Sequence, residues 1–201
     1  MKKYINLLKN NLIYFDNYQN EMINPKISFI APVYNKESFL CSFITSIQNQ
    51  LIKEFEIIFI DDCSRDNSTK VITDKIKTDK RIKLIQNRKN MGSLFSRALG
   101  AKTSKGEYVI FVDADDLILK DGLLKVYKHI KKFDLDIVQF SSIIKRRNKL
   151  VINKRCKEYK NIIYQPILSY IYYYKRDTGR EGNIVLWDKL IKREVTLKAI
   201  N

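Results

Sequence analysis

Three carboxylates lie within four positions directly after one of the most apolar stretches of the sequence. Asp113, Asp115 and Asp116 follow Tyr108-Val-Ile-Phe-Val112, a run typical of a strand buried on both faces. Neighbouring carboxylates repel each other unless a positive charge neutralises them. Asp113 and Asp115 are spaced to reach one hard cation from a tight turn. A solvated acidic loop, with Asp116 capping a helix, explains the same four residues, so both interpretations stay open at this point.

Two further polar clusters, residues 32–37 and 61–66, also follow predicted strands. Because the carboxyl ends of parallel strands meet at one edge of a sheet, we expect both clusters to lie beside Asp113–Asp116. This convergence favours a metal and a ligand with several hydrogen-bond donors. The sequence has neither a Gly-x-Gly-x-x-Gly fingerprint after the first strand nor a P-loop, which excludes the dinucleotide-binding and P-loop classes. No serine or cysteine is placed with a histidine, so covalent hydrolase chemistry is unsupported.

The elements that must position these clusters alternate regularly along the chain. Apolar runs predict strands at residues 27–33, 55–60, 82–85, 108–112 and 136–141. Helical spacing predicts helices at residues 37–50, from Asn67 or Ser68 to 76, 93–103 and from 121 or 122 to 133. Such alternation predicts an α/β fold with a mostly parallel sheet flanked by helices. After residue 142 the alternation of strands and helices ends. We expect an irregular part there, with an exposed loop or hairpin, a short aromatic helix at 166–174 and a helix at 184–200.

Composition places the chain among globular proteins. Its 201 residues are 45% apolar and 11% aromatic, and no apolar run reaches the length of a membrane span. Lys9, Asn10 and Asn11 interrupt the amino-terminal segment, which argues against a signal peptide. Three separated cysteines and one histidine indicate a reducing compartment with neither disulfides nor a zinc site. We therefore expect a cytoplasmic location.

The net charge of +16 is concentrated in part of the chain. Residues 143–160 carry eight lysines and arginines against Glu158 alone. Such charge attracts nucleic acid, anionic membrane or anionic substrate without distinguishing them. Frequent Lys, Asn and Ile also suggest a compositional bias of the genome, which explains part of the charge without any partner. The sequence has no recognisable motif for reading nucleic acid, so we expect no nucleic-acid partner.

Three segments together resemble family-2 glycosyltransferases of the GT-A fold. They are Ile-Ser-Phe-Ile-Ala-Pro-Val-Tyr-Asn-Lys-Glu at 27–37, Ile-Ile-Phe-Ile-Asp-Asp-Cys-Ser-Arg-Asp-Asn-Ser at 57–68 and Lys-Gly-Glu-Tyr-Val-Ile-Phe-Val-Asp-Ala-Asp-Asp at 105–116. The resemblance covers residues 26–142, and a weaker match at 187–193 is similar to an acceptor-side segment of bacterial members. It implies a Rossmann-like GT-A fold and an inverting transfer of a hexose from a nucleotide-diphosphate sugar, with a UDP-sugar expected. The implied acceptor is a surface glycan or a lipid-linked glycan.

The resemblance also assigns roles to individual residues. The implied donor-binding residues are Pro32, Val33, Tyr34, Glu37, Asp62, Arg97, Asp113 and Ala114. Tyr34 would lie against the base, Asp62 would accept a hydrogen bond from it, and Arg97 would face the diphosphate. In the Asp-x-Asp motif, Asp115 would ligate Mn²⁺ or Mg²⁺, and Asp113 would contact the metal's water shell or the ribose. Taken singly, Arg97 is also explained as a surface helix residue, and Glu37 as an ordinary first-turn acid.

The expected catalytic base has no counterpart in the sequence. Inverting members of the resembled family carry it in a Glu-Asp pair soon after the segment that resembles 187–193. The nearby acids Asp177, Glu181 and Asp188 do not match that position, and the sequence ends at Asn201. We therefore expect a truncated chain whose base lies beyond Asn201. The alternative function is a nucleotide-sugar-binding domain that transfers poorly or not at all, since general base catalysis contributes roughly 10²–10⁴-fold.

These expectations divide the chain into three parts. Residues 1–24 are predicted to form an amphipathic helical extension, 25–142 the nucleotide-sugar-binding GT-A core and 143–201 a partial acceptor-side region. The first part would pack either on the domain or on a membrane surface. In the second case it would act with the basic stretch to bring the chain to the anionic inner face of a membrane as a peripheral protein. A nucleotidyltransferase would share the sheet and the metal. It would also need a glycine-rich loop with Arg and Lys after the first strand, which is missing.

Overall fold

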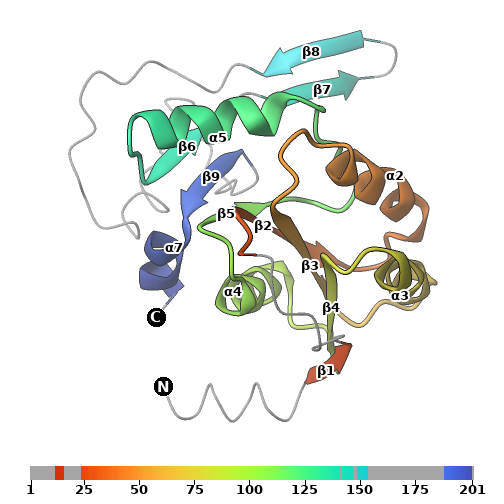
Figure 1. Ribbon diagram of the computed structural model, residues 1–201. Coiled ribbons are helices and arrows are strands. Elements are labelled where there is room, and N and C mark those ends of the chain that lie inside the picture. Colours follow the sequence, from red (N-terminus) through yellow and green to blue (C-terminus); the bar gives the residue numbers. More distant parts are fainter. Residues whose placement is uncertain (1–11, 16–23, 141, 147–148, 154–187, 201) are drawn as a thin grey trace, which may run out of the picture.

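The described part of the chain folds around a large mixed sheet (Figure 1). The computed structural model describes residues 12–15, 24–140, 142–146, 149–153 and 188–200. The seven strands lie in the order β1-β4-β3-β2-β5-β9-β6. Their bounds are β1 Leu12–Phe15, β2 Ile27–Val33, β3 Phe55–Asp61, β4 Ile82–Asn87, β5 Tyr108–Phe111, β6 Ile137–Gln139 and β9 Lys189–Lys192. Strands β4, β3, β2 and β5 are parallel, which confirms the predicted α/β class.

Helices cover both faces of the sheet. On one face lie α2 (Glu37–Gln48), α3 (Ser68–Thr78) and α5 (Gly122–Lys132), and on the other lie α4 (Ser93–Thr103) and α7 (Arg193–Ile200). Alternate residues of β2, β3, β4 and β5 enter the two cores, so that Phe29 packs with the first set of helices and Ile30 with the second. Because both faces are covered, β2 and β3 are buried along almost their whole length, as their continuous apolar runs predict.

Helix α4 lies unusually close to the sheet because of Gly100. A Cβ atom at this position would come within 2.4 Å of Ile30 Cγ2 and 2.7 Å of Ile60 Cδ1. Real side chains do not approach so closely, so glycine allows the helix backbone to rest directly on β2 and β3. The close contact places the start of α4 at the carboxyl ends of these strands.

The predicted amino-terminal helix is wrong where it can be checked. Residues 12–15 form β1, which pairs antiparallel with β4 from Leu12 opposite Asn87 to Phe15 opposite Leu84. The segment Leu-Ile-Tyr-Phe is rich in β-forming residues, and pairing with it covers an edge of β4 that would otherwise be unpaired. The other residues of the predicted extension up to residue 23 lie outside the described residues.

The predicted helix at 184–200 is only partly correct. Residues 189–192 form β9, and helix α7 begins at Arg193. Leu190 and Ile191 are consecutive, yet they enter the cores on opposite faces of the sheet, which a strand allows and a helix does not. Strand β9 lies antiparallel between β5 and β6, so the predicted fifth strand, shortened to 137–139, does not pair with β5.

The basic stretch begins with the hairpin that the sequence predicted as one of two options. Strands β7 (Ser142–Arg146) and β8 (Lys149–Asn153) pair antiparallel in a separate sheet. The remaining basic residues up to 160 and the predicted aromatic helix at 166–174 lie outside the described residues. Within the described ranges, no helix is both long enough and apolar enough to cross a membrane.

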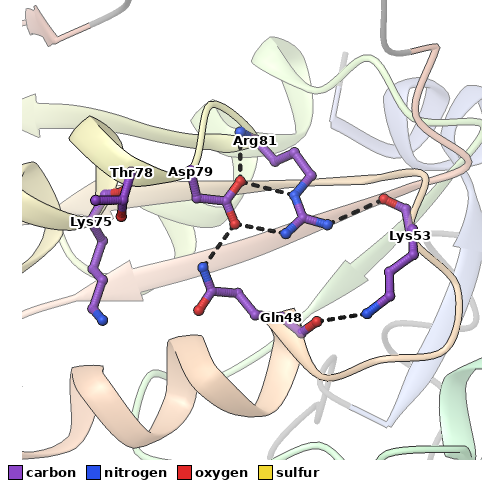
Figure 2. Close-up of polar contacts among 6 residues, drawn as sticks. All are labelled: Gln48, Lys53, Lys75, Thr78, Asp79 and Arg81. Atoms are coloured by element: carbon purple, nitrogen blue, oxygen red, sulfur yellow. Dashed lines mark hydrogen bonds and ion pairs between the residues drawn. The ribbon is translucent and has the colours of Figure 1, made fainter.

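Figure 2 shows an ion pair between Asp79 and Arg81, which lies at the amino-terminal edge of the sheet. Arg81 donates to both oxygens of Asp79, from Nε at 2.9 Å and from Nη2 at 2.7 Å, and Gln48 Nε2 donates to the same carboxylate at 2.8 Å. Burial alone would raise the pKa of Asp79, but these hydrogen bonds outweigh it and hold the pKa at about 2. The Arg81 guanidinium also lies 4.1 Å from the ring centroid of Phe55. The cluster therefore links the end of α2, the loop before β4 and the start of β3.

Replacing Asp79 should remove a pH-dependent part of the stability. The folded-state pKa of about 2 lies below the ordinary value of 3.8, so this stabilisation is complete above about pH 4 and is lost as the pH falls toward 2. We expect Asp79→Asn to lower the free energy of unfolding by about 2 kcal/mol at pH 7 and by much less at pH 2.5, measured by urea denaturation. The control, Asp74→Asn, removes an exposed pair with Lys77 and should change little at either pH. An equal loss at both pH values for Asp79→Asn would contradict the assignment.

Candidate functional site

A cavity of about 360 Å³ opens at the carboxyl ends of β2, β3 and β5 and at the start of α4. This is the edge at which open α/β sheets bind ligands, and the volume suits a small molecule. Its lining residues are Pro32, Val33, Tyr34, Lys36, Asp62, Asn90, Gly92, Ser93, Arg97, Asp113, Ala114 and Asp115. All the donor- and metal-site residues expected from the sequence are among them except Glu37. The three loops after β2, β3 and β5, far apart in sequence, therefore lie together at one edge, as expected for parallel strands.

The loop after β2 is fixed to the loop after β3. Asn35 has a left-handed backbone with a φ of 53°, and its N–H donates to Ser64 Oγ at 3.0 Å. The Arg65 N–H returns a hydrogen bond to Asn35 Oδ1 at 2.8 Å. Asparagine tolerates this conformation better than most residues, and here it also bonds across the loops. These bonds hold the neighbouring Tyr34 at the cavity, with 41% of its surface exposed.

Glu37 belongs to this loop connection and not to the cavity lining. Its carboxylate accepts hydrogen bonds from the N–H of Asn67 at 3.1 Å and from Asn67 Nδ2 at 2.9 Å. In return, the N–H groups of Glu37 and Ser68 donate to the two oxygens of Asp66, each at 3.0 Å. The Asp66 carboxylate thus accepts one first-turn N–H from α2 and one from α3. The sequence predicted a cap at Asn67 or Ser68, but the side chain of Asn67 makes no capping bond, and the Asp66 carboxylate accepts from the N–H of Ser68 instead.

Asp62 holds the loop that precedes α4. It is only 4% exposed, and its Oδ1 accepts from Asn87 Nδ2 at 2.7 Å and from the Met91 N–H at 2.8 Å. Its Oδ2 accepts from the N–H of Gly92 at 2.8 Å. Since a carboxylate oxygen accepts two hydrogen bonds, Oδ2 keeps one acceptor position for a ligand in the cavity. Gly92, with a φ of 85°, has the left-handed conformation that this turn requires.

The acidic motif after β5 is neutralised by two basic side chains from other elements. Arg97 Nη2 of α4 lies 2.7 Å from Asp113 Oδ1, and Lys36 Nζ lies 2.5 Å from Asp115 Oδ2. The Nε of Arg97 is buried and has no hydrogen-bond partner among the described residues. Burial first, and then the charges of Asp113 and Asp115, raise the pKa of Asp116 to about 6. The positive charges of Lys36 and Arg97 offset the repulsion among these carboxylates. Asp116 does not cap the next helix, because α5 begins only at Gly122.

Sequence reasoning missed Lys36 as a site residue. It lies in the predicted polar cluster 32–37, but one lysine among 38 basic residues gives no signal of its own. The structure reveals its role through the contact with Asp115, which is distant in sequence. The loop that Asp62 holds was not missed, because the resemblance covers Asn90, Gly92 and Ser93, which also line the cavity.

A divalent cation fits the oxygen ligands at the end of β5. Asp113 and Asp115 offer carboxylate oxygens to the cavity, which suit Mg²⁺ and Mn²⁺. Within the described ranges, no group of three His, Cys, Asp or Glu side chains could hold a metal without help. Mg²⁺ commonly uses one or two carboxylates and completes its coordination with substrate phosphates and water. The residues therefore fit a cation that arrives with a phosphate-bearing ligand.

The described acids at the cavity are all engaged, and Asp188 lies elsewhere. Asp188 is 1% exposed, accepts a hydrogen bond from Gln139 Nε2 at 2.8 Å and pairs with Lys189. It is absent from the described cavity lining, so it does not face a ligand there. Asp177 and Glu181, the other two acids considered from the sequence, lie outside the described residues.

Comparisons with known proteins agree with one another. The sequence model of "Glycosyl transferase family 2" matches residues 28–196. An uncharacterized glycosyltransferase of Haemophilus influenzae is 43% identical over 101 residues, which are 50% of this chain and 40% of the relative. A cholesterol galactosyltransferase of Borreliella burgdorferi is 34% identical over 186 residues, which are 86% of this chain and 49% of the relative.

A solved structure supports the same relationship. The crystal structure of S. aureus TarS 1–349 in complex with UDP-GlcNAc matches with a TM-score of 0.51 and 32% identity, over 56% of this chain and 33% of the crystallised TarS chain. This chain thus spans less than half the length of each of these three relatives.

Loss of the Asp62 carboxylate should loosen the loop before α4. We expect Asp62→Asn to speed amide hydrogen exchange at Met91 and Gly92 by about tenfold or more, because a buried hydrogen bond to a charged group contributes roughly 1.5–3 kcal/mol. Exchange can be followed by NMR, with the amides of Ile72 and Ile76 in α3 as the internal control. Unchanged exchange at Met91 and Gly92 would show that Asp62 does not hold this loop.

Proposed function

This chain belongs to glycosyl transferase family 2, and we propose that it binds a nucleotide-diphosphate sugar in the cavity beside β2, β3 and β5. The observation that carries the proposal is the meeting of three parts at one edge: an exposed aromatic ring at Tyr34, a buried acceptor at Asp62 and the acidic motif after β5. Each part suits a different portion of such a donor. The transferred group in this proposal is a hexose.

The base and ribose portion of the donor would lie nearest Tyr34 and Asp62. An exposed aromatic ring offers a stacking surface for any base, and the remaining acceptor position of Asp62 Oδ2 suits an N–H donor such as that of uracil. Because Asp62 is rigidly held by backbone donors, its oxygen is fixed in place before the ligand binds. The similarity to a protein crystallised with UDP-GlcNAc supports a UDP-sugar.

The diphosphate would lie between Arg97 and the acidic motif. Arg97 has a buried Nε without a described partner, and a phosphate oxygen could accept from it while Nη2 remains with Asp113. Asp115, assisted by Asp113, would hold Mn²⁺ or Mg²⁺ against the diphosphate. When bound, such a cation supplies Lewis-acid stabilisation of the charge on the departing nucleoside diphosphate.

Transfer requires an acceptor hydroxyl to attack the anomeric carbon as the bond to the diphosphate breaks. A single displacement of this kind inverts the configuration, and the hydroxyl proton must pass to a base. The described acids that line the cavity are Asp62, Asp113 and Asp115, and all are engaged in hydrogen bonds or ion pairs. We therefore expect the base outside the described residues. The proposed acceptor is a surface glycan or a lipid-linked glycan.

The second candidate is a chain that binds the donor without transferring the sugar. The same observation favours it, because the described cavity holds the groups proposed to bind the donor, while each described acid that lines it is already in a hydrogen bond or an ion pair. Donor binding with metal but without turnover would be its signature.

Removing Asp115 should separate these possibilities. We expect the unmodified chain with Mn²⁺ to hydrolyse or transfer from a UDP-sugar, and Asp115→Ala to reduce turnover at least about 100-fold, since metal stabilisation is worth several kcal/mol. UDP binding measured by calorimetry should lose its dependence on Mn²⁺ in the variant. Asp74→Asn, which changes an acid on the outer face of α3, is the matched control.

The outcomes of this experiment are distinct. Metal-dependent UDP binding without turnover in the unmodified chain would favour the second candidate. Absence of UDP binding, with or without Mn²⁺, would contradict the proposed site altogether.

We also propose that the chain works in the cytoplasm as a peripheral protein at the anionic inner face of the membrane. The support is the run of eight basic residues between 143 and 160, part of which forms the β7–β8 hairpin. Lysines and arginines near an anionic surface contribute about 1 kcal/mol each. The chain should therefore sediment with vesicles containing phosphatidylglycerol at low salt and be released by 0.5 M NaCl. Equal sedimentation with neutral phosphatidylcholine vesicles would contradict the electrostatic attraction.

A further inference from the structure

Lys36 joins the loop after β2 to the acidic motif after β5, and neither the motif nor the family assignment gives it a role. We propose that Lys36 is an internal counter-ion that holds Asp115 in the free protein and moves to the diphosphate when the donor binds. Metal and nucleotide then bind cooperatively. The diphosphate draws Lys36 away from Asp115 and so frees the carboxylate for the metal, and the metal takes Asp115 and so frees Lys36 for the diphosphate. This inference rests on the proposed function, since it concerns the same donor site.

The backbone of Lys36 is fixed, so its side chain alone can make this move. The Lys36 N–H donates to the buried Ser68 Oγ at 2.8 Å, and the Lys36 carbonyl accepts from the N–H of Phe39 at 2.9 Å in the first turn of α2. These bonds anchor the residue at the junction of the two loops. A lysine side chain is a compact charge on a flexible four-carbon stem, suited to exchange between two anionic partners.

The ion pair is close but partly open to solvent. Lys36 Nζ lies 2.5 Å from Asp115 Oδ2, and the two side chains are 32% and 38% exposed. Pairs with this exposure are weak, so a stronger anion can displace Asp115 from the lysine. Arg97 differs, because it is 21% exposed and also donates to Ser93 Oγ while it pairs with Asp113. Of these two cations at the acidic motif, Lys36 is therefore the one that exchanges more readily.

Competition for Asp115 makes the binding of metal depend on the nucleotide. A divalent cation that binds alone must take the carboxylate from Lys36 and leave the ammonium group beside another positive charge. A diphosphate offers Lys36 a new partner in the same cavity, since both Lys36 and Asp115 line it. UDP should therefore tighten the binding of Mn²⁺, and by linkage Mn²⁺ should tighten the binding of UDP by the same factor.

The test is calorimetric titration of the 201-residue chain with MnCl₂ alone, with UDP alone and with both, corrected for the Mn²⁺–UDP complex in solution. Lys36→Met should bind Mn²⁺ alone about two- to tenfold more tightly, because the competing ammonium is gone. It should bind UDP alone about tenfold more weakly, because a charge-assisted hydrogen bond is lost. The factor by which UDP tightens Mn²⁺ binding should fall accordingly.

Two further variants separate charge from packing. Lys36→Gln is a second neutral replacement and should behave as Lys36→Met does, with folding checked by circular dichroism. The control Lys26→Met removes an ion pair with Glu54 of the same 2.5 Å length, on residues outside the cavity lining, and should leave all three titrations unchanged. Weaker Mn²⁺ binding in both neutral Lys36 variants, or unchanged titrations in both, would overturn the inference while leaving the donor site intact. Failure of the unmodified chain to bind UDP under any condition would overturn the proposed function itself, and this inference with it.

Discussion

Repulsion among the carboxylates at the end of β5 is the constraint on which the site depends. Asp113 and Asp115 are each neutralised by a basic side chain from another element, and burial raises the pKa of Asp116 to about 6. Each basic side chain reaches its partner because of a separate structural feature. Ser68 anchors the backbone of Lys36, and Gly100 lets α4 lie close enough to the sheet to present Arg97 at its edge. At the proposed donor site, the fold therefore brings two basic side chains to the acids whose charges they balance.

The two edges of the sheet serve different purposes. At the amino-terminal edge, buried acids make complete sets of hydrogen bonds with protein groups. Glu56, for example, accepts from Ser28 Oγ at 2.6 Å and from Lys83 Nζ at 2.8 Å. At the carboxyl edge, Asp115 and Lys36 remain more than 30% exposed, and Arg97 Nε is without a described partner. We propose that a charged ligand binds at the carboxyl edge, because the Lys36–Asp115 pair there is partly exposed and the buried Arg97 Nε has no partner among the described residues.

The parallel core and most of the cavity lining were predictable, because strand–helix alternation fixes the strand direction and brings the loops after the strands to one edge. The errors fall where pairing between distant segments decided the structure. Residues 12–15 form a strand because they pair with the edge of β4. Residues 189–192 form a strand because they pair with β5 on one side and with β6 on the other. Glu37 looked like a ligand contact, but the loop after β3 uses its carboxylate, a contact that no local pattern encodes.

The most direct test of the account is a crystal structure of the chain with UDP and Mn²⁺, with the metal located by its anomalous scattering. We predict a manganese peak next to Asp115, the base beside Tyr34 and Asp62, and the Lys36 ammonium on the diphosphate instead of on Asp115. A nucleotide bound away from this edge, or manganese without Asp115 among its neighbours, would contradict the claim that the three loops form a donor site.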